Sequence, residues 1–156
     1  MNAEIKSIIR NIQNTLQGEP WFGRPVYAIL DEIDPSIIDK KPNDKSHSSI
    51  ELLYHMITWA EFTLKRVEGD KETDLKASEE LDWRKLDLKK NSWEKGIAEF
   101  KEIHSNLIKV LGNKDDEFLK QIVDYREYNY RFLLNGLIQH NIYHLGQIAY
   151  IGKMYS

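Results

Sequence analysis

A long apolar segment near the C-terminus, residues 133–151, constrains the fold of this chain more than any other stretch. It is too long for an ordinary strand and contains no proline. Its apolar side chains and two histidines recur at the spacing of one helix face, at Leu133, Leu137, His140, His144, Ile148 and Ile151. The segment therefore predicts a buried helix that carries two imidazoles one turn apart on an apolar face.

Three further segments carry apolar side chains at three- and four-residue spacing, and each predicts an amphipathic helix. They are residues 5–16, 50–64 and 93–110. A shorter piece, residues 26–33, follows a turn rich in proline and aromatic residues, and we interpret it as the continuation of the first helix. Ser48 with Glu51 matches the capping box that starts a helix.

The connections between these segments are long. Residues 34–47 read as a polar loop, and residues 69–90 as a charged connection with a short helical turn around 79–83. A short turn is expected at Phe118 and Leu119, and residues 122–130 are expected to be extended. The sequence thus predicts an all-α fold, a four-helix bundle with long connections, which forms a single domain over residues 1–156.

Composition excludes several classes of function. The chain has 22 Lys and Arg against 25 Asp and Glu, so its net charge of −3 gives no electrostatic reason to expect nucleic acid or an anionic membrane as partner. No long uncharged apolar run exists to span a bilayer, and the N-terminus lacks the apolar centre of a signal peptide, so a cytoplasmic location is expected. Cysteine is absent, and any metal site must therefore use His, Asp, Glu or Tyr.

The histidines are the main chemical signal. His140 and His144 lie four residues apart, where two imidazoles can bind one metal ion. His55, in the middle of another predicted helix, is the expected third ligand, which would leave open positions on a divalent ion. His47 lies in a polar loop without an expected role, and His104 is expected to be a partly exposed structural histidine.

Three alternative interpretations of the histidines fit the sequence less well. Asn141 stands where a zinc protease has its glutamate base, and no histidine has the Glu-x-x-His spacing of a di-iron bundle. A haem between His55 and one of the pair leaves the other histidine without a purpose. The histidines can also be side chains that only fill a core.

The motif His140-x-x-Tyr143-His144-x-Gly146-Gln147-Ile148 and the segment 51–61 resemble the DinB-like superfamily of metal-dependent enzymes. The resemblance implies a four-helix bundle, with His55, His140 and His144 as ligands of a zinc or nickel ion, and frequently a homodimer. It also implies a small-molecule substrate. Some relatives join a low-molecular-weight thiol, such as bacillithiol or mycothiol, to an electrophile, and others resemble hydrolases or isomerases.

Two polar side chains near the expected ligands are candidate catalytic residues. Glu51 lies one turn before His55 and Gln147 three residues after His144. Glu51 fits a helix-capping role as well. The turn at residues 20–24 is a candidate to close a pocket, with Arg24 facing an anionic group.

The functional hypothesis is a metal-dependent hydrolase or thiol S-transferase, in which a three-histidine site activates water or a thiol against a small electrophile. Two alternatives stay open. One is a non-catalytic bundle that binds a metal or another ligand, and the other is an interaction protein.

Overall fold

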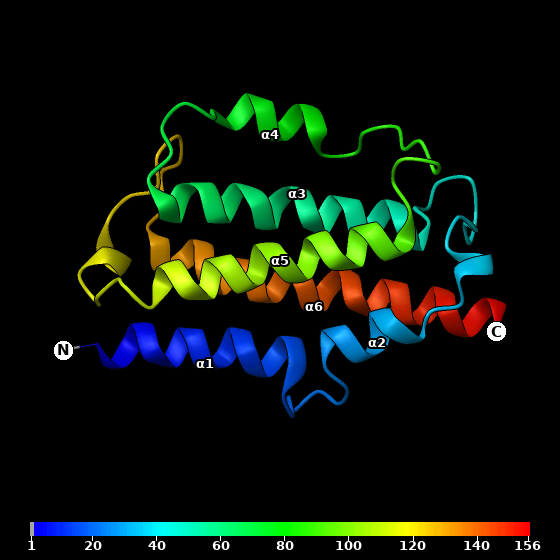
Figure 1. Cartoon of the computed structure of the whole chain (residues 1–156), viewed down its shortest axis with the longest axis horizontal. Helices are drawn as coiled ribbons and strands as arrows, with labels where there is room; N and C mark the ends of the chain where they lie inside the picture. Colours follow the sequence, from blue (N-terminus) through cyan, green and yellow to red (C-terminus); the bar gives the residue numbers. More distant parts are fainter. Residues whose placement is uncertain (1) are drawn as a thin grey trace.

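The computed structural model describes residues 2–156, and the helices it contains form an elongated bundle (Figure 1). Its long members are α3 (Ser49–Glu68), α5 (Trp93–Leu111) and α6 (Tyr130–Tyr155). The fourth position is shared by α1 (Ala3–Gln17) and α2 (Val26–Glu32), which lie end to end. No strand occurs among residues 2–156, so the predicted all-α four-helix bundle with long connections is confirmed.

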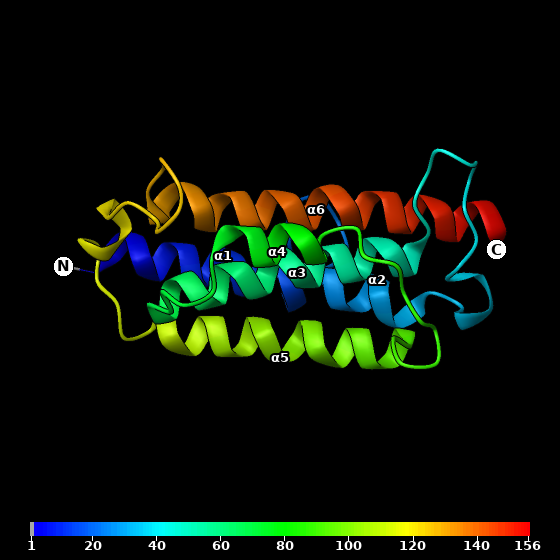
Figure 2. The same cartoon turned by 90° about the horizontal axis from the view of Figure 1, so that it is seen from above.

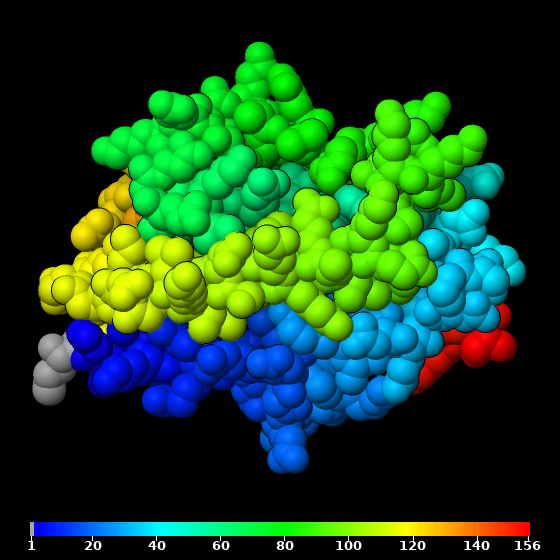
Figure 3. Space-filling model, in the orientation of Figure 1, coloured from blue at the N-terminus to red at the C-terminus, as the bar shows by residue number. Residues whose placement is uncertain are grey.

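The interrupted arm of α1 and α2 is also as predicted. Helix α1 ends at Gly18, and Pro25, with φ fixed at −69°, immediately precedes α2. The loop between them bulges from the side of the bundle opposite α4 (Leu75–Leu81), as Figure 3 shows. The start of α1 is capped from a distant segment, because Asp116 accepts hydrogen bonds from the backbone N–H groups of Glu4 and Ile5, at 3.3 and 2.8 Å.

Helix α3 begins at the predicted capping box. The Ser48 hydroxyl accepts the Glu51 backbone N–H at 3.4 Å, and the Glu51 carboxylate accepts the Ser48 backbone N–H at 2.8 Å. The helix ends at Gly69, whose φ of 81° is the left-handed conformation that glycine adopts freely. Most side chains of α3 are buried because α5 and α6 pack on its inner faces and α4 lies along its outer side (Figure 2).

The connection between α3 and α5 differs from the prediction in one respect. Its helix, α4, begins at Leu75, where the Asp74 side chain accepts the Ala77 backbone N–H at 2.9 Å, and it ends at Leu81 rather than Trp83. The earlier start follows from this aspartate cap, which was not identified in the sequence. As a result, Asp82 and Trp83 follow the helix and lie over α3.

The segment before α6 is only partly extended. A short 3-10 helix, η2 (Phe118–Lys120), begins where the Asp115 side chain accepts the Phe118 backbone N–H at 2.9 Å. Ile122 then pairs with Asn129 in an isolated antiparallel bridge, closed by a turn in which Tyr125 has a φ of 66°.

One contiguous hydrophobic core joins the helices and includes Ile5, Leu30, Leu53, Phe100, Leu134 and Ile148. Within residues 2–156, no helix combines the length and the apolar character that crossing a bilayer requires.

Candidate metal centre

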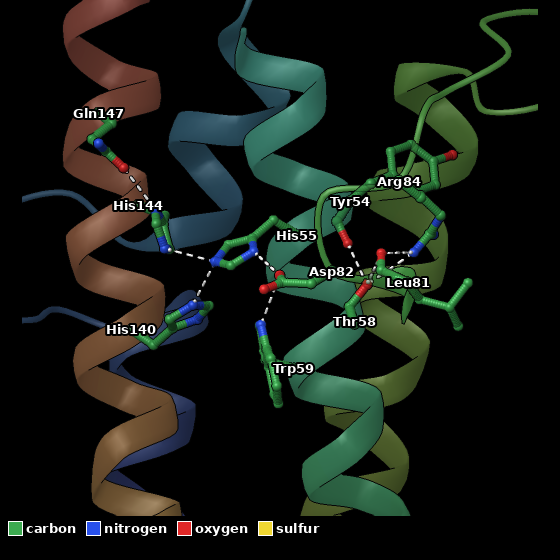
Figure 4. Close-up of polar contacts among 10 residues, drawn as sticks. All are labelled: Tyr54, His55, Thr58, Trp59, Leu81, Asp82, Arg84, His140, His144 and Gln147. Atoms are coloured by element: carbon green, nitrogen blue, oxygen red, sulfur yellow. Dashed lines mark hydrogen bonds and ion pairs between the residues drawn. The ribbon is translucent and has the colours of Figure 1, made fainter. Parts of the chain in front are cut away.

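Three imidazoles meet between α3 and α6 (Figure 4). His55 comes from the middle of α3, and His140 and His144 project from consecutive turns of α6. The Nε2 atom of His55 lies 2.9 Å from Nε2 of His140 and 3.0 Å from Nε2 of His144. We call these three residues the histidine triad; its ligand atoms all lie within 4.8 Å of one another.

Two neighbouring side chains fix the orientation of two of these rings. A carboxylate oxygen of Asp82 accepts a short hydrogen bond from Nδ1 of His55, and the same oxygen accepts the indole N–H of Trp59 at 2.9 Å. The amide oxygen of Gln147 accepts a hydrogen bond from Nδ1 of His144 at 2.6 Å. Both imidazoles therefore carry their proton on Nδ1, and their Nε2 atoms are unprotonated acceptors.

This arrangement leaves a repulsion within the triad. The Nε2 lone pairs of His55 and His144 face each other at 3.0 Å without a proton between them. His140 adds a third nitrogen, and its own Nδ1 is buried without a hydrogen-bond partner among residues 2–156. A cation at the centre would bind all three Nε2 lone pairs at once. Three neutral nitrogen donors suit zinc, nickel, copper or iron, so the residues fit a divalent transition metal.

The triad is held in the neutral form that metal ligation needs. Burial lowers the pKa of His55 and of His144, against the opposing effects of Asp82 and Gln147 respectively. Burial, together with the proximity of the two other histidines, lowers the pKa of His140 to about 3. At neutral pH all three lone pairs are therefore available to a cation.

With this geometry established, sequence comparison places the chain in a family. A model of the DinB superfamily matches residues 24–148, which is most of the chain and includes the whole triad. The chain belongs to the DinB superfamily. Membership and the converging imidazoles are together compatible with a metal site.

The fold of this DinB-superfamily chain is also similar to a solved structure. A DinB-like protein of Bacillus subtilis, YjoA, matches with a TM-score of 0.64 at 17% sequence identity. The match covers 96% of this chain and 92% of the other, and at this low sequence identity it supports the fold alone. No curated protein sequence matches the chain significantly.

The outer side of the triad is covered by an aromatic stack that the sequence did not predict. The ring of Trp83 lies between two imidazoles, with its centroid 3.9 Å from that of His55 and 3.6 Å from that of His47, both nearly parallel. His47 was expected to be a solvated loop residue, but it contacts Trp83 beside the site. Neither Asp82 nor Trp83 was identified in the sequence, where both lie in a charged connection without a motif.

Of the two candidate catalytic residues, only Gln147 contacts a member of the triad. Glu51 closes the capping box of α3 and forms an ion pair with Lys41 at 2.9 Å. Burial raises the pKa of Glu51, but the hydrogen bonds from Ser48 and the interaction with Lys41 outweigh it. The pKa of Glu51 therefore lies below its usual value. The structure therefore gives Glu51 a helix-capping role at the start of α3.

The turn between α1 and α2 does not reach the triad. Arg24 forms an ion pair with Glu32, and Trp21 is fully exposed. The loop that joins α1 and α2 lies on the side of the bundle away from α4 (Figures 1 and 3). The expectation that this turn closes a pocket at the site is wrong, because the loop bulges outward from the joint between the two helices.

His104 was expected to be partly exposed, and this is wrong: its exposed fraction is 0%. Its Nδ1–H donates to the Phe100 carbonyl at 2.8 Å, and its Nε2 accepts the side-chain N–H of Asn141 at 3.0 Å. Asn141 lies on α6, so this hydrogen bond joins α6 to the His104 ring on α5. His104 is thus a satisfied core residue, and it lies outside the group of potential metal ligands.

A cleft of about 640 Å³, lined by both polar and apolar side chains, opens on the C-terminal side of the triad, and we call it the polar cleft. Its lining includes Lys45, His47, Tyr143, Gly146 and Gln147. Gln147 therefore joins the cleft to the triad, because its amide contacts His144.

Proposed function

We propose that this protein is a metal-dependent enzyme in which the histidine triad holds a divalent ion, with zinc or nickel as the best candidates. The observation that carries the proposal is the approach of the Nε2 atoms of His55 and His144 to 3.0 Å, while an oxygen acceptor lies against the Nδ1 atom of each ring. A core histidine pair would share a proton across such a short distance. Here Asp82 and Gln147 hold both protons on the opposite side of the rings.

In this proposal His55, His140 and His144 are the ligands, and three protein ligands leave positions open, as in catalytic metal sites. When bound, such an ion lowers the pKa of a coordinated water or thiol and so supplies a nucleophile near neutral pH. The substrate is a small electrophile. The reaction is either its hydrolysis or its conjugation to a low-molecular-weight thiol, and the chain itself supplies no cysteine.

Gln147 and Asp82 act in this proposal as positioning residues. Asp82 orients His55 through its carboxylate, and Gln147 orients His144 through its amide oxygen. The polar cleft is where we place the thiol. Its size accommodates a small peptide- or sugar-linked thiol, and Lys45 offers a positive charge for an acidic group on that molecule.

We also propose that the protein forms a homodimer. Large apolar side chains remain exposed on the C-terminal half of α6, at Tyr143, Tyr150 and Met154. Their spacing of seven and four residues places them along one face of the helix, where a second copy can cover them. Light scattering that finds only 18.4 kDa particles at all concentrations would contradict this.

The enzymatic proposal is tested by a screen with metal-loaded and metal-stripped protein. Electrophiles such as epoxides, aryl halides and activated esters are incubated with and without a low-molecular-weight thiol, and products are identified by mass spectrometry. Metal-dependent conjugation or hydrolysis supports the proposal. If metal binds tightly but a broad panel shows no metal-dependent turnover, the non-catalytic binding function is favoured instead.

Replacing Asp82 with alanine is expected to weaken metal binding about 10- to 100-fold, the usual cost of losing the partner that orients a histidine ligand. Asp82→Asn keeps an oxygen that can accept the His55 Nδ1–H but removes the charge, so we expect a smaller loss. Isothermal titration with zinc and nickel measures both effects.

The matched control for Asp82 is Glu79→Ala, which removes an exposed carboxylate from α4. We expect this variant to bind metal like the parent. Equal losses in the Asp82→Ala and Glu79→Ala proteins would show that Asp82 contributes only general negative charge.

A further inference from the structure

A second cavity lies on the other side of the triad, between α3 and the start of α6. It is an apolar groove of about 190 Å³, and its lining includes Trp59, Phe62, Tyr128, Phe132, Gly136 and His140. His140 is the only ionisable residue other than tyrosine in that lining. The groove therefore differs in character from the polar cleft. It is lined by His140 of the triad itself, whereas the cleft meets the triad only through Gln147, which contacts His144.

The walls of the apolar groove are fixed by contacts among their own aromatic side chains. The ring centroids of Trp59 and Phe62 lie 5.6 Å apart, and those of Tyr128 and Phe132 lie 5.0 Å apart. The Arg126 guanidinium lies over three of these rings, those of Trp59, Phe62 and Tyr128, at 5.8, 5.5 and 5.8 Å. Because these contacts need no ligand, the groove is preformed.

The groove offers little hydrogen bonding to an occupant. Thr63 is the only aliphatic residue in the lining that has a hydroxyl group. That hydroxyl already donates to the Trp59 carbonyl at 2.8 Å. An apolar group therefore gains by leaving water for this surface, whereas a polar group would recover little of its hydration there.

Two contacts connect the apolar groove to the triad. His140 belongs to both, because it lines the groove while its Nε2 lies 2.9 Å from that of His55. Trp59 forms the second connection, since its ring lines the groove and its N–H donates to the Asp82 oxygen that also holds His55. An occupant of the groove would therefore lie directly beside His140, whose Nε2 is in contact with His55.

Gly136 leaves this part of the groove open. A Cβ atom built on Gly136 meets no other atom within 4 Å. Glycine inside a helix costs about 1 kcal/mol relative to alanine. The helix therefore carries an unfavourable residue at the position where a side chain would fill the groove.

We propose that the apolar groove binds the apolar part of the electrophilic substrate, an aryl ring or alkyl group of about six to ten carbon atoms. A cavity of about 150 Å³ is known to accept benzene, so 190 Å³ sets this size and excludes a partner helix. This inference rests on the proposed function, because it takes the reacting atom to lie at the triad. The thiol or water then approaches from the polar cleft on the opposite side.

The test is Gly136→Leu, studied first in metal-free protein so that the readout is binding rather than turnover. A helical leucine points toward the preceding turn, onto Phe132 and Leu133, and so fills the groove. The probe is 2-naphthol, followed by ligand-observed NMR and by the indole N–H signal of Trp59, which Trp59→Phe identifies. We expect parent protein to bind the probe with a shift of that signal, and Gly136→Leu to lose affinity about tenfold or more.

Gly146→Leu is the matched control. Gly146 is also on α6 and also has open space at its Cβ position, but it lines the polar cleft. We expect it to bind 2-naphthol like the parent. Phe132→Ala provides a second test at a side chain that is 64% exposed, where truncation is compatible with folding, and it too should weaken the probe.

Metal titration of the same proteins separates this inference from the proposed function. Gly136→Leu should bind zinc like the parent, because it changes no ligand. Probe binding in the groove of a protein that binds no metal would refute the proposed function and leave the groove as a ligand site. Equal probe affinity in the parent and Gly136→Leu proteins would overturn the inference. A second outcome would also overturn the inference: the parent binds no probe and is a dimer, and Gly136→Leu makes it monomeric. The occupant of the groove would then be a second copy of the chain.

Discussion

Replacing His144 with alanine is expected to weaken the binding of zinc or nickel by more than about 100-fold, beyond the loss expected for a partner that only orients a ligand. The reason is the number of donors: two imidazoles remain of three, and the Nδ1–H contact with Gln147 is lost with the ring. Competition titration against a chelator of known affinity measures this loss in the parent and variant proteins.

The same variant separates a metal ligand from a core histidine through its effect on stability. In metal-free protein, His144→Ala removes one of two facing lone pairs but also leaves a cavity at a buried position, so the decisive quantity is the part of the free energy of unfolding that depends on metal. In the parent, metal at about 1,000 times its dissociation constant adds about 4 kcal/mol, and the variant should lack this gain. Denaturant unfolding with and without metal gives both values.

The control for His144 is Gln139→Ala, at an exposed position of the same helix, which should keep the parent's metal affinity. The opposite pattern would contradict the site assignment. If His144→Ala binds metal as tightly as the parent and lowers the stability of the metal-free protein by several kcal/mol, the histidines serve only to fill the core.

Acidification is expected to destabilise the fold through His104 by about 3 kcal/mol between pH 6.5 and pH 4. Burial lowers the pKa of His104 to about 4, against an ordinary value of 6.5, while the Phe100 carbonyl opposes the shift. As the pH falls, the unfolded chain binds a proton at His104 before the folded chain does. The contribution of neutral His104 to stability is therefore fully present above pH 6.5. It is lost as the pH falls toward the folded-state pKa.

This dependence is measured by comparing unfolding free energies of the parent and His104→Leu at pH 7 and pH 4.5. The variant is expected to be less stable at pH 7, because Asn141 loses a partner, but to lose less on acidification than the parent. His47→Leu, at a partly exposed histidine, is the control and should follow the parent. Parallel pH profiles for the parent and His104→Leu proteins would show that His104 does not carry the effect.

The sequence predicted those features of the bundle that depend on residues within a single helix. The capping box at Ser48 and Glu51 marks the start of α3, and the apolar repeat of residues 133–151 marks the body of α6. The spacing of His140 and His144 likewise fixes their common face, because helical geometry alone decides it. Pairing these two with His55 needed only the expectation that two bundle helices face each other.

Prediction was weaker where a residue's environment comes from another element. His104 lies at the border of the apolar face of α5, which indicated partial exposure, but Asn141 on α6 closes over it. Asp82 lies 27 residues from His55 and in a connection without a periodic pattern, so no local signal joins them. The turn at residues 20–24 was expected to close a pocket, but its loop points away from the site, and no signal within the turn itself sets that direction.

By itself the sequence determined which side chains share a helix face: the triad's two α6 histidines, the caps and the apolar stripes follow from periods and hydrogen bonding within a few residues. Only the tertiary structure decided how the connection after α4 folds back. That connection brings Asp82 and Trp83 to His55 and thereby sets which nitrogen carries the proton. The physical reason is that such contacts depend on the path of a long connection, and no periodic pattern in the sequence encodes that path. The entropy of closing the connection does not select a path either, because it changes only slowly with the length of the connection.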